Sequence, residues 1–346
     1  MNNTKIKSLA IQMPKNSVAN DEPPYSEIEH ISKTWFRFWG VDRRHIIDRE
    51  SGETAIELAL KASKQAIDLA GIQPEDVDLI LCNSTCFDGW SEDPSIVYPR
   101  LSHALKTRLN CKNALVLDVD QECLTFLVSM QIANGYLKNG QVKNVLVCAS
   151  EYISSILDFT DKSSTIFADG AVAAILNKEP NDTGLISSSY KTNAEVYDLA
   201  VAQWRNPSYP KKEGLTTEDY GLYFTIEEDT QAKMQKFIPV LVPEVIKEAL
   251  TKINLTTEDV DFYIFHQTSK TMVDIWANAV GIDYDKYILT VKTYGCLASA
   301  STPVTLYEAL KQGRIKIGDT VVIAGAAIGW GFGAQVWKIG NKIEIN

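Results

Sequence analysis

The sequence predicts an α/β protein built from two similar halves. Apolar runs of strand length alternate with longer helical patterns, which is typical of sheets that are buried on both faces. Two short patterns of the first half return in the same order in the second half. A cysteine, Cys123, stands where a predicted strand gives way to a predicted helix. We therefore expect two duplicated halves, residues 1–180 and 181–346, that pack as one compact unit.

The first half begins with a clear amphipathic helix. Apolar residues recur at helical spacing over Ala55–Ala70, and Gly71 supplies the usual left-handed end of a helix. Short apolar runs follow, separated by turn residues. The further elements expected in this half are strands Val77–Cys82, Asn113–Val119, Asn144–Cys148 and Ala171–Leu176, and a helix Cys123–Lys138 that Gly140 ends.

The second half resumes the alternation of strands and helices after a polar, aromatic-containing loop near Arg205–Tyr220. The strands expected here are Gly184–Lys191, Asp261–Phe265, Tyr287–Val291, Thr320–Ala324 and Ala334–Ile339, and the helices are Gln231–Lys252, Lys270–Val280 and Ser299–Lys311.

The repeat can be followed residue by residue. The sequence Glu-Asp-Val-Asp ends at Asp78 in the first half and at Asp261 in the second, and Leu-Lys-x-Gly ends at Gly140 and Gly313. The second pair of matches aligns Cys123 with Cys296. Equivalent loops of two pseudo-twofold halves meet near the axis. We therefore expect Cys123, Cys296 and the segment after strand Asp261–Phe265 to share one cavity.

Composition narrows the class of protein. The chain has 346 residues, of which 45% are hydrophobic and 23% are charged, as in an ordinary globular protein. A net charge of −10 without a lysine and arginine stripe argues against nucleic-acid binding. No signal peptide and no uncharged run long enough to span a membrane is seen, so a cytoplasmic location is expected. Six cysteines without a CxxC pair predict free thiols and no metal site.

Cys123 is the first candidate for chemistry. The predicted turn from strand to helix places it among unpaired backbone N–H groups at the positive end of a helix dipole. This environment is expected to favour thiolate and to lower the thiol pKa. A single cysteine is more often a buried structural residue. The functional interpretation of Cys123 therefore needs a partner.

His266 is the best candidate for that partner. It follows strand Asp261–Phe265, at the edge of the sheet where α/β proteins collect functional groups. Alone, a histidine there is more often a hydrogen-bonded structural residue, but pairing with Cys123 across a duplicated fold reverses that preference. Imidazole within reach can hold a thiolate, polarise a carbonyl or transfer a proton. The other histidines, His30, His45 and His103, lie in predicted surface, charged or helical stretches.

Four motifs resemble those of the type III β-ketoacyl synthases, a family with the thiolase fold. They are Asp118–Phe126 around the cysteine, Phe167–Ala171, Phe265–Gln267 around the histidine, and the glycine-rich Gly325–Gly331. Three further stretches, Trp35–Arg44, Ser150–Ser154 with Leu157–Thr160, and Gly329–Trp337, are similar more specifically to the branch that makes alkylquinolones. The resemblance covers essentially the whole chain and implies an αβαβα arrangement of layers.

The resemblance also implies an acyltransferase that needs no cofactor. Cys123 would take a medium-chain acyl group from acyl-CoA or an acyl carrier protein and pass it to a β-keto acid such as 2-aminobenzoylacetate, with His266 stabilising the enolate. Backbone N–H groups of Cys123 and Ile328 would hold the oxyanion, and Trp35 would stack on the adenine of CoA. Lys270 is the single cation in the first helical turn after His266, which mildly favours CoA over an acidic carrier protein. The resemblance further implies a homodimer, or a heterodimer with a related chain.

One departure from the family pattern bears on the reaction. Ordinary members have asparagine after the glycine that here is Gly295, seven residues before a proline; this chain keeps Pro303 but has Cys296. A thiol donates hydrogen bonds poorly compared with a carboxamide. By analogy with losing one oxyanion donor, decarboxylation of malonyl thioesters should slow by ~10²–10³. A specialised condensation is therefore favoured over fatty-acid initiation.

Three alternatives remain open from the sequence. The chain could be a ketosynthase or an O- or N-acyltransferase of another natural-product or fatty-acid pathway. It could be a non-catalytic partner subunit, although Cys123 and His266 are both retained. It could also be a redox sensor in which Cys123 and Cys296 form a disulfide, which a reducing compartment disfavours.

Overall fold

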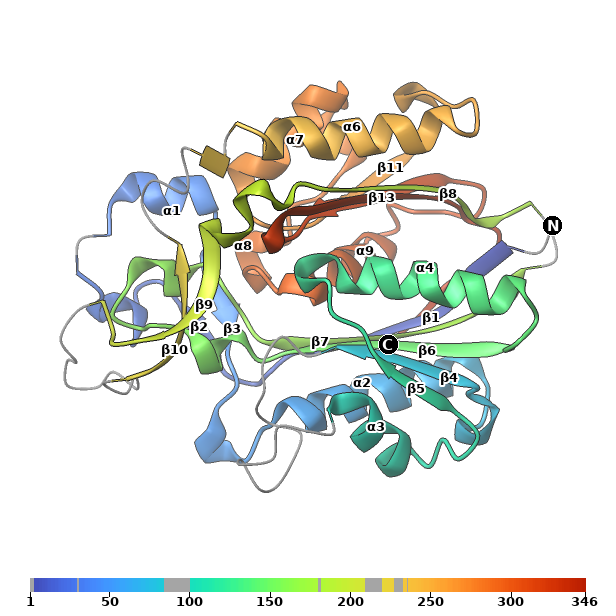
Figure 1. Cartoon of the computed structure of the whole chain (residues 1–346), viewed down its shortest axis with the longest axis horizontal. Helices are drawn as coiled ribbons and strands as arrows, with labels where there is room; N and C mark the ends of the chain where they lie inside the picture. The colour runs from blue at the N-terminus through green and yellow to red at the C-terminus, as the bar shows by residue number, and fades with distance from the viewer. Residues whose placement is uncertain are drawn as a thin grey trace.

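Two β-sheets stacked face to face form the centre of the protein. The computed structural model describes residues 3–29, 31–83, 100–179, 182–208, 220–226, 233–234 and 236–346. Helices cover the outer face of each sheet, and two further helices lie between the sheets (Figure 1). The molecule is therefore a five-layered αβαβα thiolase fold, as expected.

The first sheet has six strands in the order β14-β1-β7-β6-β4-β5. The strands β4, β5 and β6 run parallel to one another, and β7 is antiparallel to both β6 and β1. Their bounds are β1 Asn3–Gln12, β4 Leu79–Asn83, β5 Leu115–Asp118, β6 Asn144–Glu151, β7 Gly170–Glu179 and β14 Glu344–Ile345.

The second sheet repeats this pattern. Its order is β11-β12-β13-β8, with β11 parallel to β12 and β13 antiparallel to both neighbours, which matches β4-β6-β7-β1. Its strands are β8 Gly184–Thr192, β11 Phe262–Phe265, β12 Thr320–Ala326 and β13 Gly331–Lys338. The predicted duplication is therefore present in the topology.

Among the described residues, six helices form the other three layers. The helices α2 (Ala55–Ala70) and α3 (Leu101–Leu109) pack on the first sheet, and α6 (Ile238–Thr251) and α7 (Lys270–Val280) cover the second (Figure 1). Between the sheets lie α4 (Thr125–Lys138) and α9 (Ser301–Lys311). Most residues of α4 and α9 are buried because each helix has a sheet on both sides.

The chain returns to the first sheet at its C-terminal end. Strand β14 pairs in parallel with β1. Beyond it, the Asn346 side chain bonds both the N–H and the carbonyl of Ile11, and its backbone carbonyl accepts a hydrogen bond from Tyr307. Residues from both ends of the sequence thus build one sheet. The proposed division between residues 180 and 181 falls outside the described residues.

Several boundaries differ from the sequence prediction. The strand predicted over Tyr287–Val291 is wrong: Tyr287 forms an isolated bridge to Tyr263, and α8 starts at Val291 (Val291–Tyr294). The side chain of Gln267 accepts the N–H groups of Thr290 and Val291, so these groups bond a side chain rather than a strand. The helices predicted from Cys123 and Ser299 begin as 3₁₀ turns and become α-helical two residues later.

Some elements were not predicted at all. They include strand β1, helix α1 (Lys33–Trp39), helix α3, the short pair β2 (Ser17–Ala19) and β3 (Arg43–His45), and the hairpin β9 (Ala200–Arg205) with β10 (Gly221–Ile226). Helix α6 begins at Ile238; the prediction began it at Gln231, which lies outside the described residues, as do His30 and Cys86. In the described part of the chain, no helix has the length and apolar character needed to cross a membrane.

Candidate active site

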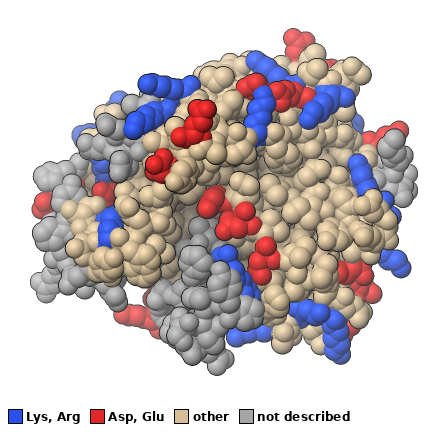
Figure 2. Space-filling view, in the orientation of Figure 1, with Lys and Arg blue, Asp and Glu red and all other residues tan. Residues whose placement is uncertain are grey.

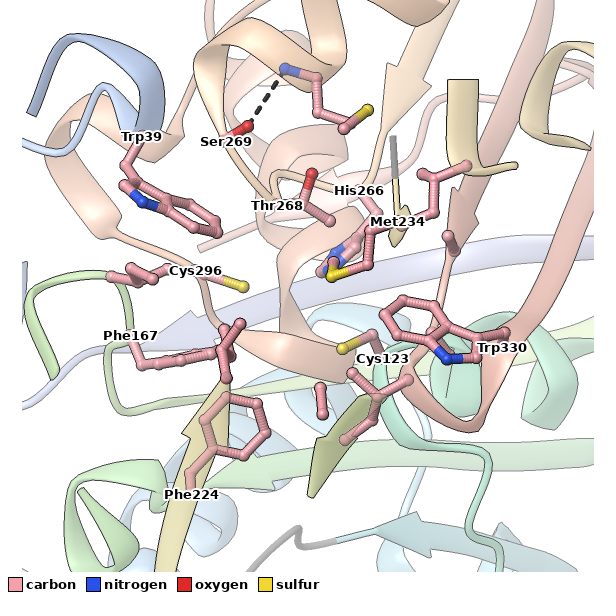
Figure 3. Close-up of a pocket in the computed structure, with 18 of the residues that line it drawn as sticks. Trp39, Cys123, Phe167, Phe224, Met234, His266, Thr268, Ser269, Cys296 and Trp330 are labelled. Atoms are coloured by element: carbon pink, nitrogen blue, oxygen red, sulfur yellow. Dashed lines mark hydrogen bonds between the residues drawn. The ribbon is translucent and has the colours of Figure 1, made fainter. Parts of the chain in front are cut away.

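An apolar cavity lies where the turn before α4 meets the ends of β11 and β12. Its empty space, together with the open solvent at its mouth, amounts to about 760 Å³. Cys123, His266 and Cys296 all line it, and their side chains approach a common space (Figure 3). The three residues that the repeat predicted to meet therefore do meet. Aromatic and sulfur-containing side chains form much of the remaining wall, among them Phe38, Trp39, Phe167, Phe224, Met234 and Trp330.

Cys123 occupies a strained turn. It sits in a 3₁₀ turn, Glu122–Leu124, ahead of α4, and Glu122 has a φ of 49°, which non-glycine residues rarely adopt. The backbone N–H of Ile328 donates a hydrogen bond to the Cys123 thiol. An amide that already points at the reacting sulfur is well placed to reach an oxygen on a group attached there.

The pKa of Cys123 moves in the direction opposite to our expectation. Burial raises the pKa of this thiol well above its usual value, the charges of Cys296, Glu122 and Glu151 raise it further, and only the Ile328 N–H lowers it. Exclusion of water from an apolar cavity thus outweighs the helix dipole. This raised pKa makes the neutral thiol the main form of Cys123 at neutral pH.

The same turn occurs in the second half. Ala298 has a φ of 41° and precedes α9 as Glu122 precedes α4. Aligned by these turns, Cys123 corresponds to Ser299, whereas the sequence match aligned it with Cys296. The difference arises because α4 is three residues longer than α9, so the offset found at the helix ends does not hold at their starts.

His266 follows β11 and is almost fully buried. Only 1% of its surface is exposed, and its N–H donates to the carbonyl of Ala324 on β12 at 2.8 Å. Burial lowers the pKa of the imidazole to about 3, so the ring is neutral at physiological pH. Its Nδ1 has no hydrogen-bond partner among the described residues. A neutral imidazole can donate a hydrogen bond to a developing enolate or accept a proton.

Gly325 sets the position of His266. A Cβ at residue 325 would lie 2.4 Å from the Cβ of His266, which is too close for any side chain. If His266 and Cys123 have the roles that the family resemblance implies, Gly325→Ala should displace the imidazole and slow the condensation step by about 10²-fold, since a shift of this size disrupts alignment. Acyl loading on Cys123 should change much less. Separate single-turnover assays of the two half-reactions would check this.

Gly135→Ala provides the control for that variant. Gly135 lies within α4, and a Cβ there meets nothing within 4 Å. It should leave both half-reactions unchanged. Equal losses in the two half-reactions of Gly325→Ala would contradict a specific effect on His266.

Cys296 stands beside the cavity as a second buried thiol. Its N–H donates to the carbonyl of Ile166 at 2.9 Å, and its own carbonyl accepts the N–H of Ala168 at 3.0 Å, so backbone bonds fix the residue. Burial raises the pKa of this thiol to about 12. Cys123 and Cys296 are both free thiols in the structure.

Trp35 lies outside the wall of this cavity, unlike its neighbours Phe38 and Trp39 on α1. Its indole N–H donates to Thr165 at 2.9 Å, and the Lys162 ammonium lies 5.0 Å from the ring centre. Stacking of Trp35 on adenine stays a prediction. The motif around Trp35 therefore pointed to the right helix. The residues of that helix that line the cavity are Phe38 and Trp39, about one turn further along.

The Lys270 ammonium pairs with Asp274 of the same helix at 2.7 Å, so the positive charge of Lys270 is offset by a neighbouring carboxylate. On the face shown in Figure 2, most basic side chains lie toward the outline and acidic ones gather near the centre.

No group of three His, Cys, Asp or Glu side chains able to hold a metal is found in the described residues.

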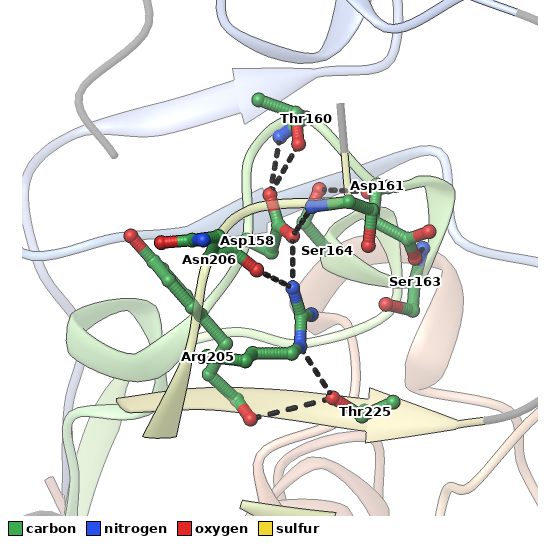
Figure 4. Close-up of polar contacts among 10 residues, drawn as sticks. Asp158, Thr160, Asp161, Ser163, Ser164, Arg205, Asn206 and Thr225 are labelled. Atoms are coloured by element: carbon green, nitrogen blue, oxygen red, sulfur yellow. Dashed lines mark hydrogen bonds and ion pairs between the residues drawn. The ribbon is translucent and has the colours of Figure 1, made fainter. Parts of the chain in front are cut away.

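A buried ion pair holds the hairpin that closes one side of the cavity. Asp158 is 1% exposed and accepts a hydrogen bond from Arg205 of β9 at 2.8 Å and one from the N–H of Ser208 at 2.7 Å (Figure 4). Arg205 in turn donates to Thr225 of β10 at 2.9 Å. The neighbouring residue, Phe224, lines the cavity. Asp158 therefore fixes a wall of the site from outside it.

Asp158→Asn should destabilise the protein by about 3–5 kcal/mol at neutral pH, because it leaves Arg205 without its buried partner. Burial alone would raise the pKa of Asp158, but hydrogen bonds from Thr160, Arg205 and Ser208 lower it. Its contribution to stability is thus present above the unfolded-state pKa of ~3.9 and is lost as the pH falls through the lower folded-state pKa. Urea unfolding of both proteins against pH would check this.

Thr225→Val is the milder comparison, since it removes one neutral acceptor from Arg205 and should cost only about 1 kcal/mol. The difference in unfolding free energy between wild type and Asp158→Asn should shrink at low pH. If it stays constant down to the lowest pH, the charge of the carboxylate does not cause the loss of stability.

The duplicated five-layered fold, with a cysteine and a histidine brought together from its two halves, defines a thiolase-fold condensing enzyme. Comparisons with known proteins agree. Models of 3-oxoacyl-[acyl-carrier-protein] synthase III and of its C-terminal part match residues 117–194 and 250–339. The chain is 36% identical to 2-heptyl-4(1H)-quinolone synthase subunit PqsC of Pseudomonas aeruginosa, covering 99% of both chains. It belongs to the 3-oxoacyl-[acyl-carrier-protein] synthase III family and is an acyltransferase.

Other similar proteins include the β-ketoacyl-[acyl-carrier-protein] synthase III of Ehrlichia canis, at 30% identity over 96% of this chain and 98% of that one. Solved structures share the fold. Synthase III of Aquifex aeolicus has a TM-score of 0.82 at 24% identity, with 97% and 99% of the two chains covered. The priming β-ketosynthase of the R1128 polyketide pathway also has a TM-score of 0.82, at 20% identity, with 98% and 96% covered.

Proposed function

We propose that this enzyme condenses a medium-chain acyl group with a β-keto acid acceptor such as 2-aminobenzoylacetate, in alkylquinolone-type biosynthesis. The observation that carries the proposal is the replacement of the family asparagine by Cys296 at the wall of an apolar cavity that also holds Cys123 and His266. Similarity to the quinolone synthase subunit over the whole chain supports the same acceptor class.

The first half-reaction loads the enzyme. The Cys123 sulfur attacks the carbonyl of an acyl thioester, the carbon–sulfur bond to the donor breaks, and the proton of the Cys123 thiol passes to the departing sulfur, which leaves as a thiol. The N–H of Ile328 already points at this sulfur, so with the N–H of Cys123 it holds the oxyanion of the tetrahedral intermediate. The apolar side chains around the cavity, such as Phe224 and Met272, take up the acyl chain.

The second half-reaction forms the carbon–carbon bond. The β-keto acid loses carbon dioxide, and the resulting enolate carbon attacks the acyl group, which releases the Cys123 thiol. His266 stabilises the enolate as a neutral hydrogen-bond donor. A β-keto acid loses carbon dioxide more readily than a malonyl thioester does. The reaction with this acceptor therefore depends less on the hydrogen bond that the asparagine would donate.

A two-part assay tests the proposal. Intact-mass measurement after incubation with a panel of acyl-CoAs should show one acyl group on the chain, with medium chains preferred. Adding 2-aminobenzoylacetate or, separately, malonyl thioester to the loaded enzyme distinguishes the acceptors. If the malonyl thioester removes the acyl group from the enzyme faster than 2-aminobenzoylacetate does, the function is fatty-acid or other polyketide synthesis instead.

We further propose that the enzyme pairs through β5 with a second thiolase-fold chain, either a copy of itself or a related subunit. Strand β5 is an edge of the six-stranded sheet, yet Leu115 is half exposed and its neighbours Val116 and Leu117 are apolar. A bare apolar edge strand is a template for pairing. The quinolone synthase relative is itself named as a subunit.

Val116→Pro should break this pairing. The N–H groups of Leu115 and Val119 bond the carbonyls of Asp78, just before β4, and of Cys82 within it, so by alternation the N–H of Val116 faces outward. Proline removes that outward donor and keeps the inward bonds. With the partner chain present, whether a second copy or the related subunit, we expect a dimer for wild type and for Val116→Ala, and a monomer for Val116→Pro, by sedimentation velocity. A dimer in all three would place the interface elsewhere.

A further inference from the structure

The imidazole of His266 has no hydrogen bond at its Nδ1 atom to hold it in place. That atom is buried and lacks a partner within the described part of the chain. In most sites where a histidine reacts, a carboxylate or carbonyl bonds the second ring nitrogen and thereby orients the ring. The position of the His266 ring therefore depends on packing and on the backbone that carries it.

The backbone after His266 forms a tight turn. The N–H of Thr268 donates to the carbonyl of His266 at 3.0 Å, which makes Gln267 the central residue of a three-residue turn. Strand β12 restrains only the start of this turn, since the N–H of His266 donates to Ala324 at 2.8 Å. Whatever holds Gln267 thus holds the rest of the turn.

The side chain of Gln267 is buried and fully bonded. Its Nε2 donates to the carbonyls of Phe265 at 3.0 Å and Ile288 at 3.3 Å. Its Oε1 accepts the N–H groups of Thr290 at 2.9 Å and Val291 at 3.2 Å. A carboxamide offers two donor hydrogens and two acceptor lone pairs, so these four bonds use its whole capacity. Only 1% of the residue is exposed.

A fifth bond ties Gln267 to the layer between the sheets. Its backbone N–H donates to the hydroxyl of Ser301 at 2.9 Å, and Ser301 is the buried first residue of α9. The chain that follows Val291 runs through α8 to Cys296. Gln267 therefore links the turn of His266 to α9 and to the segment that leads to Cys296.

We propose that Gln267 is the positioning residue of His266, and that its carboxamide does for this ring what a bond at Nδ1 does elsewhere. Gln267 does not line the cavity, so it acts through His266 and does not touch substrate. The inference rests on the proposed role of His266 in condensation. Loss of the carboxamide should affect condensation and spare loading, which uses Cys123 and backbone N–H groups.

Gln267→Met tests this inference, because it keeps the length of the side chain and removes all four carboxamide bonds. The full-length enzyme is loaded with octanoyl-CoA, and decay of the acyl-enzyme is followed by rapid quench with 2-aminobenzoylacetate or malonyl-CoA. We expect decay to slow by ~10²-fold with whichever acceptor wild type uses, since a displacement of ~1 Å has this effect. The rate of loading should stay close to that of wild type.

Gln267→Glu is the conservative variant. A buried glutamic acid is held neutral, and it then keeps one donor hydrogen and one acceptor oxygen. It should recover part of the condensation rate that Gln267→Met loses.

Gln335→Met is the matched control. Gln335 has no exposed surface, donates to Leu127 and to the Tyr190 hydroxyl, both at 2.9 Å, and accepts from Trp337 at 3.0 Å. These bonds lie on α4, β8 and β13, away from the turn of His266. The control should lose stability without slowing condensation relative to loading. If it slows condensation selectively as well, loss of any buried carboxamide has this effect and the proposal is wrong.

Decay in Gln267→Met as fast as in wild type, or an equal loss in both half-reactions, would overturn the proposal. If Gln267→Met does not fold, Ser301→Ala decides. It removes only the acceptor of the Gln267 N–H and should slow decay by about two- to tenfold with loading unchanged. Wild-type decay in Ser301→Ala would then contradict the inference.

His266→Ala and crystal structures separate this inference from the proposed function. Slow decay in His266→Ala with normal decay in Gln267→Met overturns the positioning role alone, whereas normal decay in His266→Ala overturns the role of His266 in condensation. Crystal structures of wild type and Gln267→Met, or Ser301→Ala in its place, report on the ring without turnover. The imidazole should shift by ~1 Å in Gln267→Met, and rings that superimpose would contradict the proposal.

Discussion

Cys123→Ala is expected to abolish acylation of the chain by every acyl-CoA and to reduce turnover by at least ~10⁴-fold, as for other nucleophile deletions. The reason is geometric: Cys123 is the cysteine that lies in the cavity with the Ile328 N–H directed at its sulfur. Intact-mass spectrometry of the protein after incubation with donor, together with steady-state turnover, would measure both effects.

Cys296→Ala is the matched control for this variant. It removes the other thiol of the cavity but leaves the Ile328 contact in place. It should therefore still acquire one acyl group. An acyl group found on Cys123→Ala but missing from Cys296→Ala would transfer the role of nucleophile to Cys296, and acylation of neither wild type nor variant would favour the non-catalytic partner.

His266→Ala is expected to slow condensation by ~10²–10⁴-fold, the usual contribution of a positioned acid or base. Loading should be affected less, because the oxyanion donors are backbone amides. Rapid-quench measurement of acyl-enzyme decay in the presence of acceptor isolates the second step. A long-lived acyl-enzyme is the result that we expect for this variant.

His266→Gln separates hydrogen bonding from proton transfer. The carboxamide can still donate a hydrogen bond to the enolate but cannot take up a proton. Partial recovery in His266→Gln would agree with a neutral donor, which the lowered pKa of His266 favours. Unchanged decay of the acyl-enzyme in His266→Ala would remove the histidine from the reaction.

The sequence carried enough information to place the candidate site residues together. Strand and helix periods, with two repeated patterns, predicted a duplicated sheet, and a duplicated sheet requires the loops of Cys123, His266 and Cys296 to converge. Tyr287 shows where this reasoning fails. An apolar run there predicted a strand. In the structure, the Gln267 side chain accepts hydrogen bonds from the N–H groups of Thr290 and Val291 instead. A contact between residues so far apart in sequence leaves no local sequence pattern.

The sequence predicted which residues form the site better than it predicted the environment around them. The position of Cys123 before a helix predicted a lowered pKa, whereas burial raises it, because desolvation depends on residues far away in sequence. Phe224 was missed because the β9–β10 hairpin that carries it was not predicted.

The return of residues 344–346 to β1 has a consequence for how the chain is made. An N-terminal half usually folds while the rest is still being synthesised. Here β1 lacks its neighbour β14, and Ile11 lacks its contacts with Asn346, until residues 344–346 have been synthesised. The nascent first half therefore carries an open sheet edge while the second half is made.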